Sequence, residues 1–319
     1  MLNSDPNVRL AVIGGGVMGA NHARVASRTQ GVDLVAIVDL DETRRSALAN
    51  ATGVRHAATI GELRSLVDVD AVVVATPTVH HYSVAVECID AGMHVLVEKP
   101  IASTVEEGID LERRAVAAGV VLTVGHVERF NPAVRALLRC IDKPIHLELS
   151  RIGPFTPRVR DNVVVDLMIH DLDLARALAN SEVERMQVIA QSPRTAGPDM
   201  AIALATFENG VTASITASRI SQQKLRRIFV TQHDAVIAAD LMRQDLMIHR
   251  MQHVEFISDS GASIRQSGVV ETPFIENRGE PLMEELRAFV AAIHGAPPVV
   301  TARDGIAALA LVQRVLESA

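Results

Sequence analysis

The chain has 319 residues, of which 48% are hydrophobic and 22% are charged, and its formal net charge at pH 7 is −7. This composition is typical of a folded globular protein, and about 150 residues per domain indicates two domains. The acidic balance gives nucleic acids and anionic membranes no electrostatic attraction, so we expect neither as a partner. No apolar run approaches the roughly 18 residues of a membrane span, and the first residues lack a signal pattern. We therefore expect a cytoplasmic protein.

The first part of the chain alternates short apolar runs with amphipathic segments. The predicted strands are residues 8–14, 32–39, 70–76, 94–98 and 120–125, and the predicted helices between them are 16–29, 41–52, 77–91 and 104–118. Strands that are apolar throughout and are separated by helices indicate a parallel sheet covered on both faces. We predict an α/β domain with a doubly wound Rossmann sheet over residues 1–125.

The pattern changes after Gly125. Helices are predicted at 132–140 and 163–179, a strand at 145–152, and further strand-like runs to about residue 270, with a hairpin at Asn209-Gly210. Two more helices are expected at 281–294 and 302–317, and they can pack back on the first domain. We predict a second α/β domain, residues 126–319, with an open, mainly antiparallel sheet for substrate binding and oligomerisation.

A glycine motif, Gly14-x-Gly16-x-x-Gly19, follows the first predicted strand and opens the first predicted helix. This is the context that a dinucleotide-binding fingerprint requires. The first glycine permits a tight turn, the second lets the backbone approach a pyrophosphate, and the third lets the helix pack closely. Val17 and Met18 begin the helix, whose free N–H groups suit phosphates, so we expect all five residues to bind a cofactor.

Asp39 closes the second predicted strand, 20 residues after Gly19. A carboxylate at this point can bond both ribose hydroxyls and repels a 2′-phosphate, which favours NAD over NADP. Arg44 and Arg45 follow in the next helix and could soften that preference, although a solvated helix face is the commoner role for arginines there. NADP therefore stays open as the cofactor.

The loop after the strand 70–76 should lie at the same edge of the sheet. Thr76, Pro77 and His81 are predicted beside the nicotinamide half of the cofactor. His80 and His81 are adjacent, so on a helix they diverge by about 100° and cannot grip one metal ion together. We expect no metal site.

Glu98-Lys99-Pro100 ends the strand 94–98. Ligands of open α/β sheets bind beyond the carboxyl ends of the strands, so Glu98 and Lys99 are predicted beside the cofactor. Asp166 and His170 lie four residues apart in the helix 163–179, where they would share one face. Taken alone, such a pair is more often structural than catalytic.

With these three motifs in order, the chain resembles the glucose–fructose oxidoreductase/inositol dehydrogenase (Gfo/Idh/MocA) family from end to end. The resemblance implies an NAD-dependent dehydrogenase acting on CH–OH groups, with Lys99, Asp166 and His170 as its catalytic group. Hydride would pass between a sugar secondary alcohol and the nicotinamide. A histidine suits general acid–base work near neutral pH, and a lysine can stabilise developing alkoxide charge. Asp166 would hold the histidine or a substrate hydroxyl.

The segments "EKPIASTVEEG", "VLTVGHVERFNPAV", "RIGPFTPRVRD" and "VVDLMIHDLDLARAL" resemble the branch that oxidises the 3-hydroxyl of UDP-N-acetylglucosamine. Arg151, Arg158 and Arg160 are predicted in a short loop before the helix 163–179, where guanidinium groups could bind a diphosphate. A charged surface loop explains them equally well. Arg129 and Asn131 are candidates for sugar contacts, and helix capping explains Asn131 equally well.

Several alternatives stay open. The substrate could be a free sugar or inositol, the reaction could be the reduction of an imine or enal, and the protein could be a non-catalytic NAD(P)-binding regulator. An open sheet with helices on one face leaves the other face to be covered. We therefore predict a homodimer or homotetramer that forms through that face.

Overall fold

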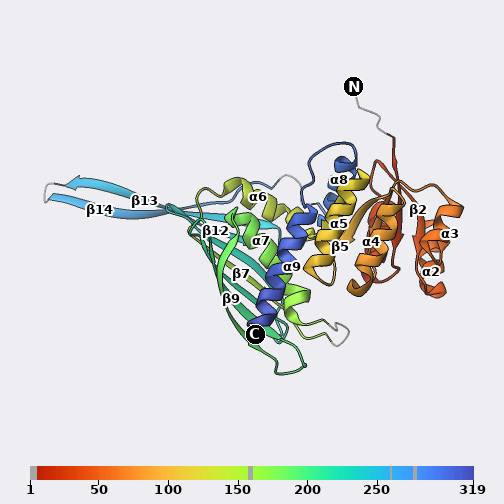
Figure 1. Cartoon of the computed structure of the whole chain (residues 1–319). Coiled ribbons are helices and arrows are strands. Elements are labelled where there is room, and N and C mark those ends of the chain that lie inside the picture. Colours follow the sequence, from red (N-terminus) through yellow and green to blue (C-terminus); the bar gives the residue numbers. More distant parts are fainter. Residues whose placement is uncertain (1–5, 157–160, 259–260, 276–278) are drawn as a thin grey trace. The chain divides into compact units, whose positions relative to one another are not determined.

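The computed structural model of the protein describes residues 6–156, 161–258, 261–275 and 279–319, and within 251–267 it describes the backbone alone (Figure 1). The chain forms two compact units. The first comprises Met1–Phe130 and Glu280–Ala310, and the second comprises Asn131–Gly279 and Leu311–Ala319. The predicted division after residue 125 falls close to the end of the first segment. The assignment of the second domain to substrate binding and oligomerisation stays a prediction.

The first unit contains a parallel sheet in the strand order β3-β2-β1-β4-β5-β6. Its strands are β1 (Val8–Ile13), β2 (Val32–Val38), β3 (Arg55–Ala57), β4 (Ala71–Val74), β5 (His94–Glu98) and β6 (Leu122–Gly125). Its helices are α1 (Val17–Ala26), α2 (Glu42–Thr52), α3 (Ile60–Leu66), α4 (His81–Asp90), α5 (Val105–Ala118) and α8 (Pro281–Ile293), with 3-10 turns η1 (Thr78–His80) and η2 (Val127–Phe130). The predicted Rossmann sheet is confirmed, while β3 and α3 are additional to the prediction.

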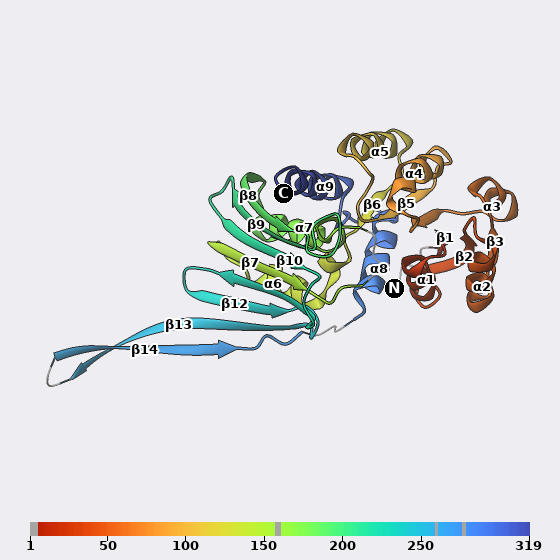
Figure 2. The same ribbon diagram turned by 90° about the horizontal axis from the view of Figure 1, so that it is seen from below.

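Both faces of this sheet are buried. On β1, Leu10 and Val12 pack in the core that contains α1 and α8, whereas Ala11 and Ile13 pack in the core that contains α4 and α5. Figure 2 shows these two pairs of helices on opposite sides of the strands. Burial on both faces is the reason that the strands read as unbroken apolar runs.

The second unit contains a larger sheet in the order β14-β13-β12-β11-β7-β10-β9-β8. Its strands are β7 (His146–Ile152), β8 (Val183–Gln191), β9 (Met200–Phe207), β10 (Thr212–Ser218), β11 (Leu225–Thr231), β12 (Ala235–Asp240), β13 (Asp245–Ser258) and β14 (Gly261–Glu271). The remaining elements are α6 (Pro132–Cys140), the π-helix η3 (Val164–Met168), α7 (Ile169–Ala179) and α9 (Ala302–Glu317), whose residues are divided between the units. The predicted mainly antiparallel sheet and the hairpin at Asn209-Gly210 are confirmed.

Two features differ from the sequence prediction. The pair β7–β10 is parallel, so the sheet is mixed. The helix expected over 163–179 begins with a π-helical turn before it becomes the α-helix α7. Asn162 stabilises this start, because its Oδ1 accepts hydrogen bonds from the N–H groups of Val164 and Val165 at 3.0 and 3.1 Å.

The two faces of the second sheet have different environments. On one face, a row of paired residues that crosses the strands is buried. This row consists of Ala203, Ile215, Leu149, Ile228, Ala239 and Leu246. The row beside it lies on the opposite face and is only partly covered. It consists of Leu204, Ser214, Glu148, Phe229, Ala238 and Met247, of which Leu204, Glu148, Phe229 and Met247 are exposed. Helices α6 and α7 lie along one face of this sheet (Figure 2).

The hairpin of β13 and β14 reaches beyond the rest of its sheet (Figure 1). Strand β12 pairs with β13 only from Asp245 to Arg250, so the remainder of β13 pairs with β14 alone. None of the helices within the described residues is both long enough and apolar enough to span a bilayer.

Candidate active site

The glycine motif forms the expected turn between β1 and α1. Gly14 has a φ of +103°, and a Cβ there would lie 2.5 Å from the carbonyl oxygen of Ala75. A Cβ on Gly19 would lie 1.7 Å from the carbonyl oxygen of Gly14, so only glycine permits this packing. By contrast, a Cβ on Gly16 would meet no atom within 4 Å.

Open space therefore lies at the start of α1, next to an uncapped helix end. Gly16 is the N-cap residue of α1 and makes no side-chain capping hydrogen bond. The first helical residue, Val17, is 81% exposed, and Met18 is also exposed. Free N–H groups and the positive end of the helix dipole fit the pyrophosphate of a dinucleotide.

Asp39 ties the end of β2 to the glycine loop. Its Oδ2 accepts a hydrogen bond from the N–H of Gly15 at 2.6 Å, and its Oδ1 accepts one from the N–H of Asp41 at 2.8 Å. Each carboxylate oxygen has a second lone pair, so Asp39 keeps the capacity to bond ribose hydroxyls. The guanidinium of Arg44 pairs with Asp41, and that of Arg45 donates to the backbone carbonyls of residues 39 and 40.

His81 joins the loops that follow β4 and β5. Its Nδ1 lies 2.8 Å from the carbonyl oxygen of Pro100, and its Nε2 lies 2.9 Å from that of Thr76. Burial lowers the pKa of His81, against the opposing effect of these two contacts. A neutral imidazole has one N–H, so it donates to one of the two carbonyls at a time.

Both ring nitrogens of His81 thus face backbone carbonyls, and its predicted contact with the cofactor stays a prediction, as does that of Pro77. The hydroxyl of Thr76 is buried and has no hydrogen-bond partner within the described part of the chain. A buried polar atom of this kind needs a partner, and a cofactor at this edge of the sheet would supply one.

Glu98 is the buried member of the Glu98-Lys99-Pro100 motif. It is 8% exposed, and its Oε1 lies 2.7 Å from Nε2 of His22 in α1. Its Oε2 accepts a hydrogen bond from the N–H of Lys99 at 3.3 Å. Burial raises the pKa of Glu98, but His22 and the charge of Lys99 outweigh that effect and lower it below its usual value. Glu98 therefore holds a negative charge directly beside Lys99.

Asp166 lies in the π-helix η3, and His170 is the second residue of α7. Both side chains are half-buried. A π-helical turn inside a helix is frequent at functional sites, which agrees with a functional role for these residues. A buried ion pair fixes the helix that carries His170, because Arg151 of β7 donates from Nε and Nη2 to Asp171 at 3.1 and 2.8 Å. The prediction that Arg151 lies in a loop and is a candidate for binding a diphosphate is wrong, since it belongs to β7 and its buried guanidinium is paired with Asp171.

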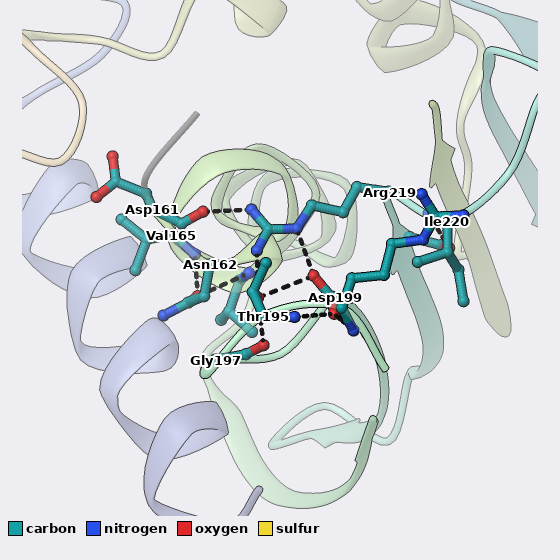
Figure 3. A network of polar contacts seen from close by, with 11 residues as sticks. Asp161, Asn162, Val165, Thr195, Gly197, Asp199, Arg219 and Ile220 are labelled. Atoms are coloured by element: carbon teal, nitrogen blue, oxygen red, sulfur yellow. Dashed lines mark hydrogen bonds and ion pairs between the residues drawn. The ribbon is translucent and has the colours of Figure 1, made fainter. Parts of the chain in front are cut away.

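A second buried ion pair lies where the chain enters η3 (Figure 3). Nε of Arg219 donates to Oδ1 of Asp199 at 2.9 Å, and its Nη1 donates to the carbonyl oxygen of Asp161 at 2.5 Å. Burial raises the pKa of Asp199, but hydrogen bonds from Arg194, Arg219 and Thr195 lower it to about 2. The network thus anchors Asp161 firmly in front of η3.

The chain is also anchored on the other side of residues 157–160. The guanidinium carbons of Arg194 and Arg219 lie 5.5 and 5.7 Å from the ring centre of Phe155, within the range of a cation–π contact. Arg158 and Arg160 themselves lie outside the described residues, so their predicted role stays a prediction.

Two further candidates occupy structural positions. Asn131 is buried and caps α6, since its Oδ1 accepts from the N–H of Ala133 at 3.1 Å while its Nδ2 donates to the carbonyl of Leu241 at 3.0 Å. The capping alternative is thus the one that the structure shows, and a sugar contact stays a prediction. Nη2 of Arg129 lies 3.8 Å from Oδ1 of Asp304.

Sequence reasoning gave no role to four buried ionisable residues of the first unit, His22, His126, Glu128 and Glu285. The signal for Glu285 was present in the sequence. It lies on the same helical face as Leu282, Leu286 and Phe289, where an apolar residue is expected. His22 lies three residues after Gly19 and carries no comparable signal.

Comparison with known proteins agrees with this geometry. A family model described as "Oxidoreductase family, NAD-binding Rossmann fold" matches residues 8–126, and the model of the GFO/IDH/MocA C-terminal domain matches residues 153–237. UDP-N-acetylglucosamine 3-dehydrogenase of Acidithiobacillus ferrooxidans is 32% identical over 98% of this chain and 95% of its own. Its solved structure has a TM-score of 0.87, with 98% of each chain covered. Myo-inositol 2-dehydrogenase of Thermotoga maritima is 28% identical over 95% of this chain and 94% of its own.

The fold, the glycine loop and these matches define an NAD-dependent oxidoreductase. The chain belongs to the Gfo/Idh/MocA family, and the predicted family, enzyme class and cofactor are confirmed. It is therefore a dehydrogenase acting on CH–OH groups, and the alternative of a non-catalytic regulator is set aside.

Replacing Asp39 with serine should shift the cofactor preference towards NADP, because the carboxylate that repels a 2′-phosphate is removed. We expect the ratio of the dissociation constants of NADPH and NADH to fall by about tenfold or more, equivalent to roughly 1.4 kcal/mol. Nicotinamide fluorescence titrations measure both constants without a substrate. Asp33→Ser, an equal charge change at an exposed position of β2, is the control. An unchanged ratio in Asp39→Ser would remove Asp39 from the ribose site.

Proposed function

We propose that this dehydrogenase oxidises the 3-hydroxyl of a nucleotide sugar of the UDP-N-acetylglucosamine type. The observation that carries the proposal is the end-to-end similarity to UDP-N-acetylglucosamine 3-dehydrogenase, which includes both domains. The glycine loop, Lys99, Asp166 and His170 all stand at the positions that the family resemblance assigns to them.

The proposed chemistry assigns one task to each side chain. His170 accepts the proton of the sugar hydroxyl, and the ammonium of Lys99 stabilises the negative charge that develops on that oxygen. Asp166 orients the imidazole or a neighbouring hydroxyl. Bound NAD supplies the acceptor for the hydride that leaves the same carbon, so the products are a ketone, NADH and a protonated histidine.

The structure shows how the backbone of Lys99 is held within its own unit. The N–H of Lys99 donates to the Glu98 carboxylate, which in turn contacts His22, so the end of β5, the residue after it and α1 form one connected group. The Glu98 carboxylate is buried, so water screens little of its charge, and that charge acts directly on the half-buried Lys99 beside it.

For the diphosphate of a nucleotide sugar, we assign Arg158 and Arg160. Their guanidinium groups and their place in the sequence, shortly before Asp166 and His170, support this assignment. Guanidinium groups bind phosphate oxygens in bidentate fashion.

A free cyclitol or sugar is the second candidate substrate. Inositol 2-dehydrogenases match this chain over most of its length, including one from Mycolicibacterium gilvum that is 28% identical over 98% of this chain and 91% of its own. That candidate requires no diphosphate site, so it predicts that Arg158 and Arg160 are dispensable.

Turnover with NAD should separate the two candidates. We expect oxidation of UDP-N-acetylglucosamine, and we expect the double variant Arg158→Gln/Arg160→Gln to raise KM by about tenfold to a hundredfold, because phosphate contacts are lost. NADH formation is followed by absorbance, with Arg185→Gln, an exposed arginine of β8, as the control. Activity confined to myo-inositol or glucose would defeat the nucleotide-sugar assignment.

The catalytic assignment makes a separate prediction. Lys99→Met and His170→Gln should each lower kcat/KM by about 10²–10⁴, the usual contribution of acid–base and charge-stabilising groups. The exposed lysine Lys224, changed to methionine, provides the control. Full activity of Lys99→Met with a good substrate would rule out the mechanism.

We further propose that the open face of the second sheet joins two copies of the chain. Leu204, Phe229 and Met247 lie on this face and are 49%, 37% and 44% exposed. Apolar groups of this size in one row favour association when they are covered by the same row of a second copy.

Light scattering at micromolar concentration should show a dimer or tetramer. The double variant Leu204→Asp/Phe229→Asp should lower the assembly size, because each change introduces a charge that association would bury. Val116→Asp, at an exposed position of α5, is the control and should leave the assembly unchanged. A monomeric wild-type protein would contradict the proposal.

A further inference from the structure

Glu285 is a buried acid that the proposed mechanism does not use. It lies in α8 with 2% of its surface exposed, among the core residues of the first unit. Neither of its carboxyl oxygens has a hydrogen-bond partner in the described part of the chain. An ionised carboxylate buried without a partner is strongly disfavoured, so this environment selects the neutral acid.

A small cavity is lined by Glu285. Its volume is about 10 Å³, and Glu285 lines it together with Thr123 of β6. The hydroxyl of Thr123 is also buried without a partner in the described residues. The volume suits about one water molecule.

Glu98 is the second acid of this region, and its surroundings differ from those of Glu285. His22 and Lys99 favour the ionised form of Glu98. Burial, followed by the negative charge of Glu98, raises the pKa of Glu285 well above its usual value. The two acids are linked through β6, because Glu98 pairs with Gly125 of that strand and Thr123, two residues earlier, lines the same cavity as Glu285. Interacting carboxyl groups whose surroundings differ in this way divide into one anion and one acid.

The other elements packed against α8 are α1 and η2. Ionisable residues occur on both elements and on the neighbouring chain. They are His22 and Arg24 in α1, Glu128 and Arg129 in η2, His126 just before η2, and Glu98 and Lys99 at the end of β5. Arg24 is engaged with Glu280, and Arg129 lies near Asp304. Within the described residues no hydrogen bond reaches either carboxyl oxygen of Glu285, so no cation compensates a charge there by direct contact.

We propose that Glu285 is a positioning residue for Lys99: a neutral acid that retains one proton beside Glu98 and so keeps a single negative charge between His22 and Lys99. The proposal rests on the proposed function of Lys99. If Glu285 ionised, a second negative charge would act on the Lys99 ammonium from the interior and would weaken its effect on the substrate oxygen.

The sign of the pH dependence follows from the raised pKa. The protonated form of Glu285 makes its full contribution to the free energy of unfolding below the pKa of a glutamate in the unfolded chain, about 4.3. That contribution is lost as pH rises towards the folded-state pKa, because the unfolded chain releases the proton first. A glutamine at the same position has no proton to lose and keeps the shape of the neutral acid.

Infrared titration and urea unfolding of the whole protein test the proton on Glu285 without any substrate. We expect a protonated-carboxyl band at pH 7 that Glu285→Gln abolishes, and a loss of wild-type stability with rising pH that this variant lacks. Glu284→Gln, next to it in α8 and paired with Arg287, is the control and should retain the band. Glu98→Gln should shift the titration of the band to lower pH, which tests the coupling even if Glu285→Gln does not fold.

The positioning role is read from the pH profile of kcat with whichever sugar the wild-type enzyme oxidises. Glu285→Gln should match the wild type near neutral pH and should extend activity to higher pH by about one unit or more. An absent band at pH 7 would overturn the proposal whatever the substrate is. A band with identical kcat profiles would overturn the positioning role. Neither result depends on the nucleotide-sugar assignment.

Discussion

The contact between His22 and Glu98 is the interaction on which the first unit's site depends. A carboxylate buried at the end of a strand needs compensation, and the imidazole at 2.7 Å and the N–H of Lys99 provide it. These contacts explain why an apolar strand ends in Glu98-Lys99-Pro100. The buried glutamate fixes the backbone that carries the lysine, while α1, which supplies His22, also begins at the cofactor's glycine loop. One helix therefore begins at the glycine loop and also supplies the histidine that contacts Glu98.

In the second unit, buried charges are likewise compensated by partners, in two buried arginine–aspartate pairs. Arg151 joins β7 to Asp171 of α7, and Arg219 joins the end of β10 to Asp199 and to the carbonyl of Asp161. Such pairs add little net stability after desolvation, but removing one partner leaves a buried charge, which makes the geometry specific. Their effect here is to hold both ends of the segment that carries Asp166 and His170.

Sequence reasoning recovered the features that depend on local pattern. Strands such as 94–98 were recognisable as apolar runs because both faces of the parallel sheet are buried. The glycine motif was recognisable because Gly14 and Gly19 stand where the structure leaves no room for a side chain. The parallel pairing of β7 with β10 was not recoverable, since their alternation is the same in either direction. Strand β3 is too short for a pattern, and the π-helical turn depends on backbone spacing that side-chain periodicity does not report. His22 and Glu285 acquire their chemistry only through burial.

A structure of the enzyme with NAD and the sugar substrate tests the central claim most directly, because it measures where the amine of Lys99 lies. We predict that its Nζ is about 3 Å from the hydroxyl that is oxidised, a normal hydrogen-bond distance, while Glu98 remains in contact with His22. The account would be contradicted if the amine of Lys99 bonded another part of the protein and made no hydrogen bond to the hydroxyl that is oxidised.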